Sequence, residues 1–208
     1  MTLPTLNARG PLHGKSPAEL TPACRVSLHA LPSSRGPRAR LPLVILIVAG
    51  VAGSGKSTVG ALIAGRLHWR FADADNFHRD ANIAKMRAGI PLTDEDRAPW
   101  LRAVGAWMDA EIAVGQSAVV ACSALKRSYR DLLLSGRPAA TMIFLQVGKD
   151  VLERRLTTRR GHFFPEQLME SQLNTVELPA PDERVHTVVS EGEPAQTAAK
   201  IIALLGVA

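Results

Sequence analysis

The chain has 208 residues, a length that suits one α/β domain with an extension at one end. Its formal net charge is +6, but residues 1–40 contribute +5 of it, so the rest of the chain is nearly neutral. Proteins that bind nucleic acid present a basic face on the folded domain, so this distribution argues against a nucleic-acid partner.

Residues 1–40 predict a disordered, basic, proline-rich tail, because they contain six prolines and no sustained apolar period. Their Arg and Ser content resembles an organellar transit peptide, but so many prolines fit an amphipathic helix poorly, and an ordinary tail is favoured. No secretory pattern is present, and the apolar run at residues 43–49 is too short to span a bilayer. Cys24 and Cys122 form neither a metal spacing nor a disulfide framework. We therefore expect a cytoplasmic protein with no membrane contact.

Residues 41–208 alternate short apolar segments with helical ones, which predicts one α/β domain with a parallel sheet covered on both faces. Ligands of such folds bind beyond the carboxyl ends of the strands. The expected strands are residues 43–49, 70–73, 118–122, 142–147 and 185–189. The expected helices are residues 57–67, 82–88, 98–114, 128–134, 150–158, 165–176 and 195–205.

Residues 50–57, Gly-Val-Ala-Gly-Ser-Gly-Lys-Ser, satisfy the phosphate-binding loop (P-loop) pattern G-x-x-x-x-G-K-[ST]. An apolar β-branched run precedes them and a helical period follows, which is the strand and helix context that such a loop needs. Lys56 would reach the terminal phosphates of ATP, and the Ser57 hydroxyl would hold Mg²⁺. The predicted nucleotide-binding residues are Gly50, Val51, Ala52, Gly53, Ser54, Gly55, Lys56, Ser57 and Thr58.

Asp73 and Asp75 follow the second strand, and alternation along an extended segment would point both carboxylates into the same site. We assign Asp73 to the Mg²⁺ shell and Asp75 to the hydroxyl of the acceptor, as its base or orienting group. The alternative is a polar loop that caps the next helix through Asp75 or Asn76.

Other P-loop classes are disfavoured by what the sequence lacks. It contains no Asn-Lys-x-Asp guanine-reading box, and residues 134–136 do not continue into a transporter ATPase signature. A kinase of small substrates remains, and a binding module that holds ATP without transfer is a second possibility. The intact Lys56, Ser57, Asp73, Asp75 and Arg159 argue against the binding module.

A lid is predicted at about residues 159–170, where Arg155 and Arg159 lead into Gly161 and two phenylalanines. Arg159 would neutralise charge on the transferred phosphoryl group, and closure would exclude water. The alternative is a solvated arginine face on an ordinary helix.

Three basic side chains and one histidine are candidates for binding an anionic acceptor. Arg97 follows an acidic triplet, while Lys126 and Arg130 share one helix face. His78 follows the paired aspartates. Surface salt bridges are the alternative for each basic residue.

Taken together, these segments resemble the small bacterial P-loop type of gluconokinase from about residue 43 to the C-terminus. The motifs that carry the resemblance are the P-loop, Asp73-x-Asp75-x-x-His78, Asp96-Arg97-x-Pro99-Trp100, Cys122-Ser123-Ala124-Leu125-Lys126 and Gly161-His162-Phe163-Phe164. The resemblance implies a nucleoside-monophosphate-kinase-like fold with a five-stranded parallel sheet, transfer of the ATP γ-phosphoryl group to the 6-hydroxyl of D-gluconate, and a homodimer.

The sequence departs from the family pattern at three positions: Ala74 replaces a usual glycine, Arg79 replaces a proline, and Leu178 stands where an acidic residue is common. The first two lie in the expected acceptor loop, and Leu178 lies toward the adenine side. The alternative acceptor is another small hydroxy acid such as shikimate.

Overall fold

The computed structural model describes residues 42–158 and 166–207, without the side chains of 156–158, 166 and 167. The predicted tail and the predicted lid residue Arg159 lie outside these ranges. Within them, no helix is long and apolar enough to cross a membrane.

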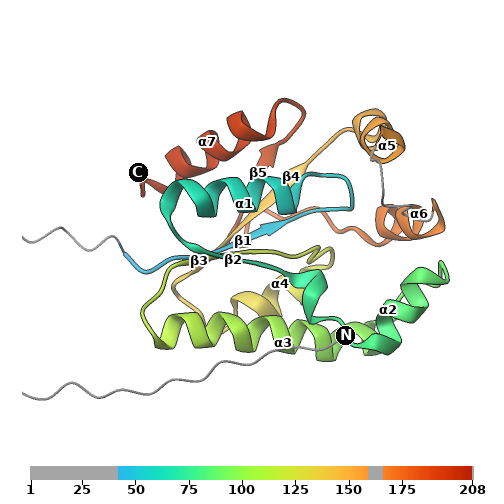
Figure 1. The fold of residues 1–208 in the computed structure, drawn as a ribbon, viewed down its shortest axis with the longest axis horizontal. Helices are drawn as coiled ribbons and strands as arrows, with labels where there is room; N and C mark the ends of the chain where they lie inside the picture. The colour runs from blue at the N-terminus through green and yellow to red at the C-terminus, as the bar shows by residue number, and fades with distance from the viewer. Residues whose placement is uncertain (1–41, 159–165, 208) are drawn as a thin grey trace, which may run out of the picture. The chain divides into compact units, whose positions relative to one another are not determined.

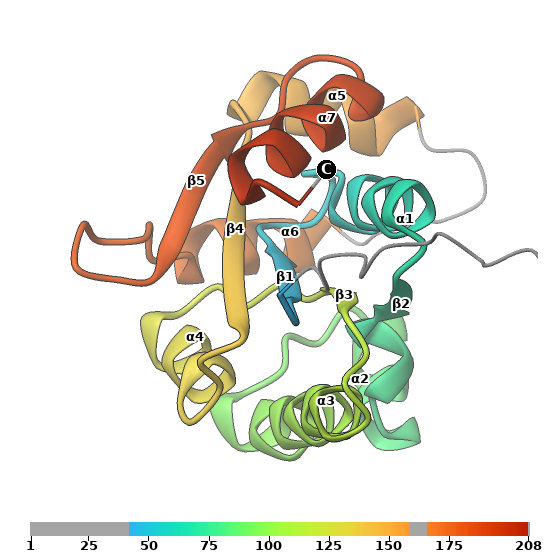
Figure 2. The same cartoon turned by 90° about the vertical axis from the view of Figure 1, so that its left-hand side faces the viewer.

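Five parallel strands form the sheet in the order β2-β3-β1-β4-β5, which confirms the predicted parallel sheet (Figures 1 and 2). Every neighbouring pair of strands is parallel. The strands are β1 (Ile45–Ala49), β2 (Arg70–Asp73), β3 (Ala118–Ala121), β4 (Ala140–Gln146) and β5 (Val185–Val189).

Helices cover both faces of the sheet, with α1 (Lys56–Leu67) and α7 (Pro194–Leu205) on one side and α3 (Asp94–Ala113) and α4 (Arg127–Leu134) on the other (Figure 2). The central strand β1 is buried on both faces, because Leu46 and Val48 pack toward α1 and α7 while Ile45 and Ile47 pack toward α3 and α4. The remaining helices are α2 (Asp80–Arg87), α5 (Lys149–Thr158) and α6 (Glu166–Thr175).

Helix α3 begins four residues earlier than its periodicity predicts, because Thr93 and Asp96 form a capping box. The Thr93 hydroxyl accepts a hydrogen bond from the Asp96 N–H at 3.3 Å, and an Asp96 carboxylate oxygen accepts one from the Thr93 N–H at 3.0 Å. The cap therefore places Arg97 in the first turns of the helix rather than in a preceding loop.

The segment after β2 also differs from the predicted geometry. The chain does not stay extended beyond Asp73 but enters the short 3₁₀ helix η1 (Ala74–Phe77), which the sequence analysis missed. Asp73 caps this helix by accepting a hydrogen bond from the Asp75 N–H at 3.1 Å. The capped turn, and not alternation along a strand, therefore places the Asp73 and Asp75 carboxylates in the same region of the structure.

Candidate active site

The P-loop turns sharply after β1 at Gly50. A Cβ atom there would lie 2.8 Å from the Leu145 carbonyl oxygen, and the φ angle of +138° is strained for other residues. The Gly50 N–H donates to the Ser123 carbonyl oxygen at 3.2 Å, which joins the start of the loop to the end of β3. Only glycine fits this turn, so the first motif position is fixed by sterics.

The loop delivers the chain to the N-terminus of α1, where Gly55 has a φ angle of +98° and supplies no side-chain cap. Lys56 bends across the loop, and its ammonium group donates to the Val51 carbonyl oxygen at 2.9 Å. Amide groups at a helix start and a lysine ammonium together attract an anion. This geometry fits a cradle for the phosphates of a nucleotide.

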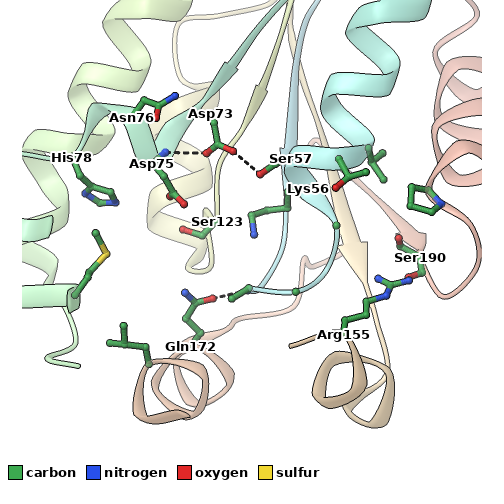
Figure 3. Close-up of a pocket in the computed structure, with 18 of the residues that line it drawn as sticks. Lys56, Ser57, Asp73, Asp75, Asn76, His78, Ser123, Arg155, Gln172 and Ser190 are labelled. Atoms are coloured by element: carbon green, nitrogen blue, oxygen red, sulfur yellow. Dashed lines mark hydrogen bonds between the residues drawn. The ribbon is translucent and has the colours of Figure 1, made fainter. Parts of the chain in front are cut away.

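Ser57 and Asp73 face each other beside the cradle (Figure 3). The Ser57 hydroxyl donates to Oδ2 of Asp73 at 2.5 Å, and both side chains are partly buried. Within residues 42–158 and 166–207, no group of three or more His, Cys, Asp or Glu side chains could hold a metal alone. One hydroxyl and one carboxylate fit Mg²⁺ that takes its other ligands from phosphate and water.

Asp75 and His78 lie on the far side of Asp73 from the loop (Figure 3). The His78 ring stacks on Trp100, with centroids 4.5 Å apart and an interplanar angle of 11°. The Trp100 indole N–H donates to the Ala74 carbonyl oxygen at 2.7 Å and so fixes η1 against α3. Burial lowers the pKa of His78, an effect that the Asp75 carboxylate opposes and the Arg97 guanidinium reinforces. The imidazole is therefore neutral near pH 7.

One cavity of about 1160 Å³ joins the P-loop to this second group of side chains. Figure 3 shows the carboxylates, His78 and Ser123 on one side of it and Arg155 with Ser190 on the other. Its lining includes the predicted site residues Ala52, Gly53, Gly55, Lys56, Ser57, Thr58, Asp73, Asp75, His78 and Arg97. The structure thus brings most of the predicted nucleotide and acceptor residues together, while Gly50, Val51 and Ser54 of the P-loop are not among the lining residues.

Lys126 is not among the residues that line this cavity. Its ammonium group pairs with the Asp94 carboxylate at 2.7 Å, and the Tyr129 hydroxyl donates to the same carboxylate. Both donors lower the pKa of Asp94, with Lys126 contributing more. Arg97 does line the cavity, and its guanidinium lies 3.5 Å from the Tyr129 oxygen.

Arg130 occupies the core and also does not line the cavity. Its side chain is fully buried, and it forms a two-point ion pair with Glu183 at 2.6 and 2.8 Å. It also donates to the carbonyl oxygens of Leu125 and Glu177 at 3.0 and 2.8 Å. This arrangement ties α4 to the segment before β5. This environment argues against the predicted acceptor role of Arg130, because four of its five N–H donors bind protein acceptors and its fully buried side chain does not line the cavity.

Several cavity residues from the C-terminal third were missed by the sequence analysis, among them Gln172 and Ser190. Gln172 of α6 accepts a hydrogen bond from the Ala52 N–H at 2.7 Å. Ser190 follows β5, and its carbonyl oxygen accepts from Arg155 at 2.9 Å. Arg155 also donates to the Ser54 carbonyl oxygen at 3.3 Å, so α5 contacts the P-loop directly. No local motif marks Gln172 or Ser190, and only the tertiary fold brings them to the loop.

Comparison with known proteins identifies shikimate kinases and gluconokinases as similar to this chain. Residues 52–205 match the family model described as shikimate kinase. A probable gluconokinase of Mus musculus is 41% identical over 178 residues, with 77% of this chain and 97% of the relative covered. The thermoresistant gluconokinase of Escherichia coli K12 is 43% identical over 150 residues, with 72% and 86% covered. The crystal structure of a gluconokinase from Sinorhizobium meliloti 1021 is 42% identical, with a TM-score of 0.72 over 80% of this chain and 93% of that one.

Proposed function

We propose that this chain, which belongs to the shikimate kinase family and within it to the gluconokinases, transfers the γ-phosphoryl group of ATP to the 6-hydroxyl of D-gluconate. The products are ADP and 6-phospho-D-gluconate. The observation that carries the proposal is the shared cavity, in which the phosphate cradle and a polar acceptor group are continuous. Such a site can hold donor and acceptor in one enclosure, and positioning is the main contribution to phosphoryl transfer.

The nucleotide occupies the P-loop half of the cavity. Backbone N–H groups of the P-loop at the start of α1 bind the phosphates, and Lys56 turns from the Val51 carbonyl oxygen to the terminal phosphates. The Ser57 hydroxyl and Asp73 would hold Mg²⁺, which would supply positive charge beside the β- and γ-phosphates.

The acceptor occupies the half formed by η1, α3 and the end of β3. The Asp75 carboxylate is exposed to the cavity. It accepts the proton of the 6-hydroxyl as the oxygen of that hydroxyl attacks the γ-phosphorus. Arg97 carries the positive charge for the gluconate carboxylate, since guanidinium groups bind carboxylates at two points. His78 lines the cavity, and a neutral imidazole can accept a hydrogen bond from a further hydroxyl through one ring nitrogen. Lys126 does not line the cavity, and its ammonium group pairs with Asp94 instead.

Arg159 of the proposed lid, at about residues 159–170, supplies positive charge to the transferred group; residues 159–165 lie outside the described ranges. The homodimer that the resemblance implies and the cytoplasmic location expected from the sequence stay predictions. Size-exclusion chromatography with light scattering and cell fractionation would check them.

The test of the function is ADP release by the purified protein with Mg·ATP, comparing D-gluconate with shikimate, other aldonates and no acceptor. We expect turnover that depends on gluconate and produces 6-phosphogluconate, identified by its mass and by oxidation with a phosphogluconate dehydrogenase. Turnover with shikimate in place of gluconate would favour the alternative acceptor. ATP binding without turnover on any acceptor would favour a binding module.

A further inference from the structure

Gln172 of α6 reaches into the cavity and contacts the P-loop (Figure 3). Its Oε1 accepts a hydrogen bond from the backbone N–H of Ala52 at 2.7 Å, although the two residues are 120 positions apart in the sequence. The side chain is half-buried. Ala52 lies in the stretch of loop between the sharp turn at Gly50 and the phosphate-binding amides near α1.

The contact with Ala52 fixes which end of the Gln172 amide faces the loop. A backbone N–H can only donate, so the amide oxygen must point to it and the amide nitrogen must point away. Figure 3 shows this nitrogen on the side of the cavity where His78 lies, opposite to Arg155. Within the part of the chain that the structure describes, Nε2 donates no hydrogen bond to the protein.

The donor end of Gln172 complements the other side chains of the acceptor half. Asp75 and the neutral His78 supply acceptors for hydroxyl protons, and Arg97 supplies charge for a carboxylate. A hydroxyl oxygen also accepts hydrogen bonds, and a neutral amide N–H can donate to it without competing for phosphate as a cation would. Gln172 provides such a donor beside the loop that holds the nucleotide.

We propose that Gln172 binds the acceptor: Nε2 donates a hydrogen bond to a hydroxyl oxygen of the sugar acid while Oε1 stays on the Ala52 N–H. This inference rests on the proposed function and adds one residue that selects for a polyhydroxy acid. The bond to Ala52 would place the acceptor in a fixed relation to the P-loop. Acceptors that lack a hydroxyl at that position would lose this bond.

The test combines changes in the enzyme with changes in the substrate. Steady-state kcat and KM would be measured for the wild type and Gln172→Leu with D-gluconate and with monodeoxy-D-gluconates. We expect Gln172→Leu to lower kcat/KM for gluconate by roughly 3- to 10-fold, as for a lost neutral hydrogen bond. With the wild type, one deoxy analogue should have a kcat/KM that is lower than that of gluconate by a similar factor. With Gln172→Leu, the same analogue should have a kcat/KM no lower than that of gluconate.

Two further variants separate the donor from the contact with the loop. Gln172→Glu keeps an oxygen for the Ala52 N–H but removes the donor. Its kcat/KM for that deoxy analogue should therefore be no lower than its kcat/KM for gluconate. Asn174→Ala changes an exposed residue of the same helix and should match the wild type. The Kd of ADP, measured by calorimetry, should stay within about twofold in Gln172→Leu because the amides nearer α1 bind the phosphates.

The assignment would be overturned if each deoxy analogue lost the same factor in kcat/KM, relative to gluconate, with the wild type as with Gln172→Leu. A tenfold weaker ADP affinity with an unchanged KM for gluconate would also overturn it, because that result would limit Gln172 to shaping the loop. Either result, with normal wild-type turnover, leaves the proposed function standing. No turnover of gluconate by the wild type would contradict the function itself, and the acceptor role of Gln172 with it.

Discussion

The hydroxyl of Ser57 donates a 2.5 Å hydrogen bond to Oδ2 of Asp73, and this bond joins the first turn of α1 to the end of β2. Oδ1 of the same carboxylate accepts the Asp75 N–H at 3.1 Å. Asp73 therefore positions both the hydroxyl that would bind Mg²⁺ and the residue that would meet the acceptor. We therefore expect a substitution at Asp73 to change the Mg²⁺ requirement and a substitution at Asp75 to change kcat.

Asp73→Asn should raise the Mg²⁺ concentration needed for half-maximal activity at least about tenfold, because the amide loses the charge of a metal ligand. The measurement is turnover as a function of free Mg²⁺ at saturating ATP, with calorimetry of Mg·ADP binding beside it. Asp80→Asn, an exposed carboxylate at the start of α2, is the control and should behave as the wild type. An unchanged Mg²⁺ requirement in Asp73→Asn would contradict the assignment of Asp73 as a Mg²⁺ ligand.

Asp75→Asn should lower kcat by about 10² to 10⁴, because an amide cannot accept the proton of the 6-hydroxyl. ADP affinity should hardly change, since Asp75 lies on the acceptor side of the cavity. Lys56→Ala serves as the reference for an enzyme without its phosphate-binding lysine. If Asp75→Asn kept normal turnover while Lys56→Ala abolished it, the assignment of Asp75 as the base would be wrong.

The local parts of the fold and the site could be predicted because each depends on neighbours in the sequence. The β1 strand, the P-loop and α1 form one continuous segment whose spacing and periodicity are readable, as are the carboxylates that follow β2. The 3₁₀ turn was missed because capping by Asp73 overrides the alternation of an extended chain.

The pairing of distant residues could not be predicted from the sequence. The partner of Arg130 lies 53 positions away, and the contact of Gln172 with Ala52 spans 120. An arginine on a helix face gives the same local pattern whether it points to solvent, to a ligand or to a buried carboxylate. Burial decides among these possibilities, and burial depends on the packing of α4 against the segment before β5.

Arg159→Ala should lower kcat at least tenfold if the arginine neutralises charge on the transferred phosphoryl group. KM for gluconate should change less, because the charge develops in the transition state. Arg154→Ala is the matched control: Arg154 is an exposed residue of α5 that pairs with Asp150 at 3.3 Å, one turn away. Rapid-quench measurement of the chemical step would check the result. A loss smaller than tenfold would make Arg159 an ordinary surface charge.

His78 should make the protein less stable as the pH falls below 6.5. Burial lowers the pKa of the folded imidazole from 6.5, so between these two pKa values the unfolded chain binds a proton that the folded chain does not. The contribution of His78 is therefore complete above pH 6.5 and is lost below it, until the folded imidazole is also protonated. Its charged neighbours, Asp75 and Arg97, have opposite effects on this pKa.

The measurement is the free energy of unfolding in urea of the wild type and His78→Gln from about pH 5 to about pH 8. The wild type should lose more stability than the variant on acidification, because glutamine does not titrate. A stability difference that is constant with pH would show that the pKa of His78 is not lowered. A wild type that gains stability on acidification relative to the variant would show that the pKa is raised.

Arg130→Met should destabilise the fold by about 3 to 5 kcal/mol, because it leaves the buried Glu183 carboxylate without its partner. The matched control is Arg127→Met on the same helix: its ion pair with Asp182 is exposed, and its loss should cost less than about 1 kcal/mol. Urea unfolding measures both.

The same variant separates a structural role of Arg130 from acceptor binding. At a temperature where Arg130→Met is folded, its KM for gluconate should stay within about twofold of the wild-type value, because the guanidinium does not line the cavity. The double variant Arg130→Met with Glu183→Gln should recover part of the lost stability, since it removes the unpaired buried charge. A large rise in KM with little loss of stability would instead return Arg130 to the acceptor site, and would require Glu183 to release it when the substrate binds.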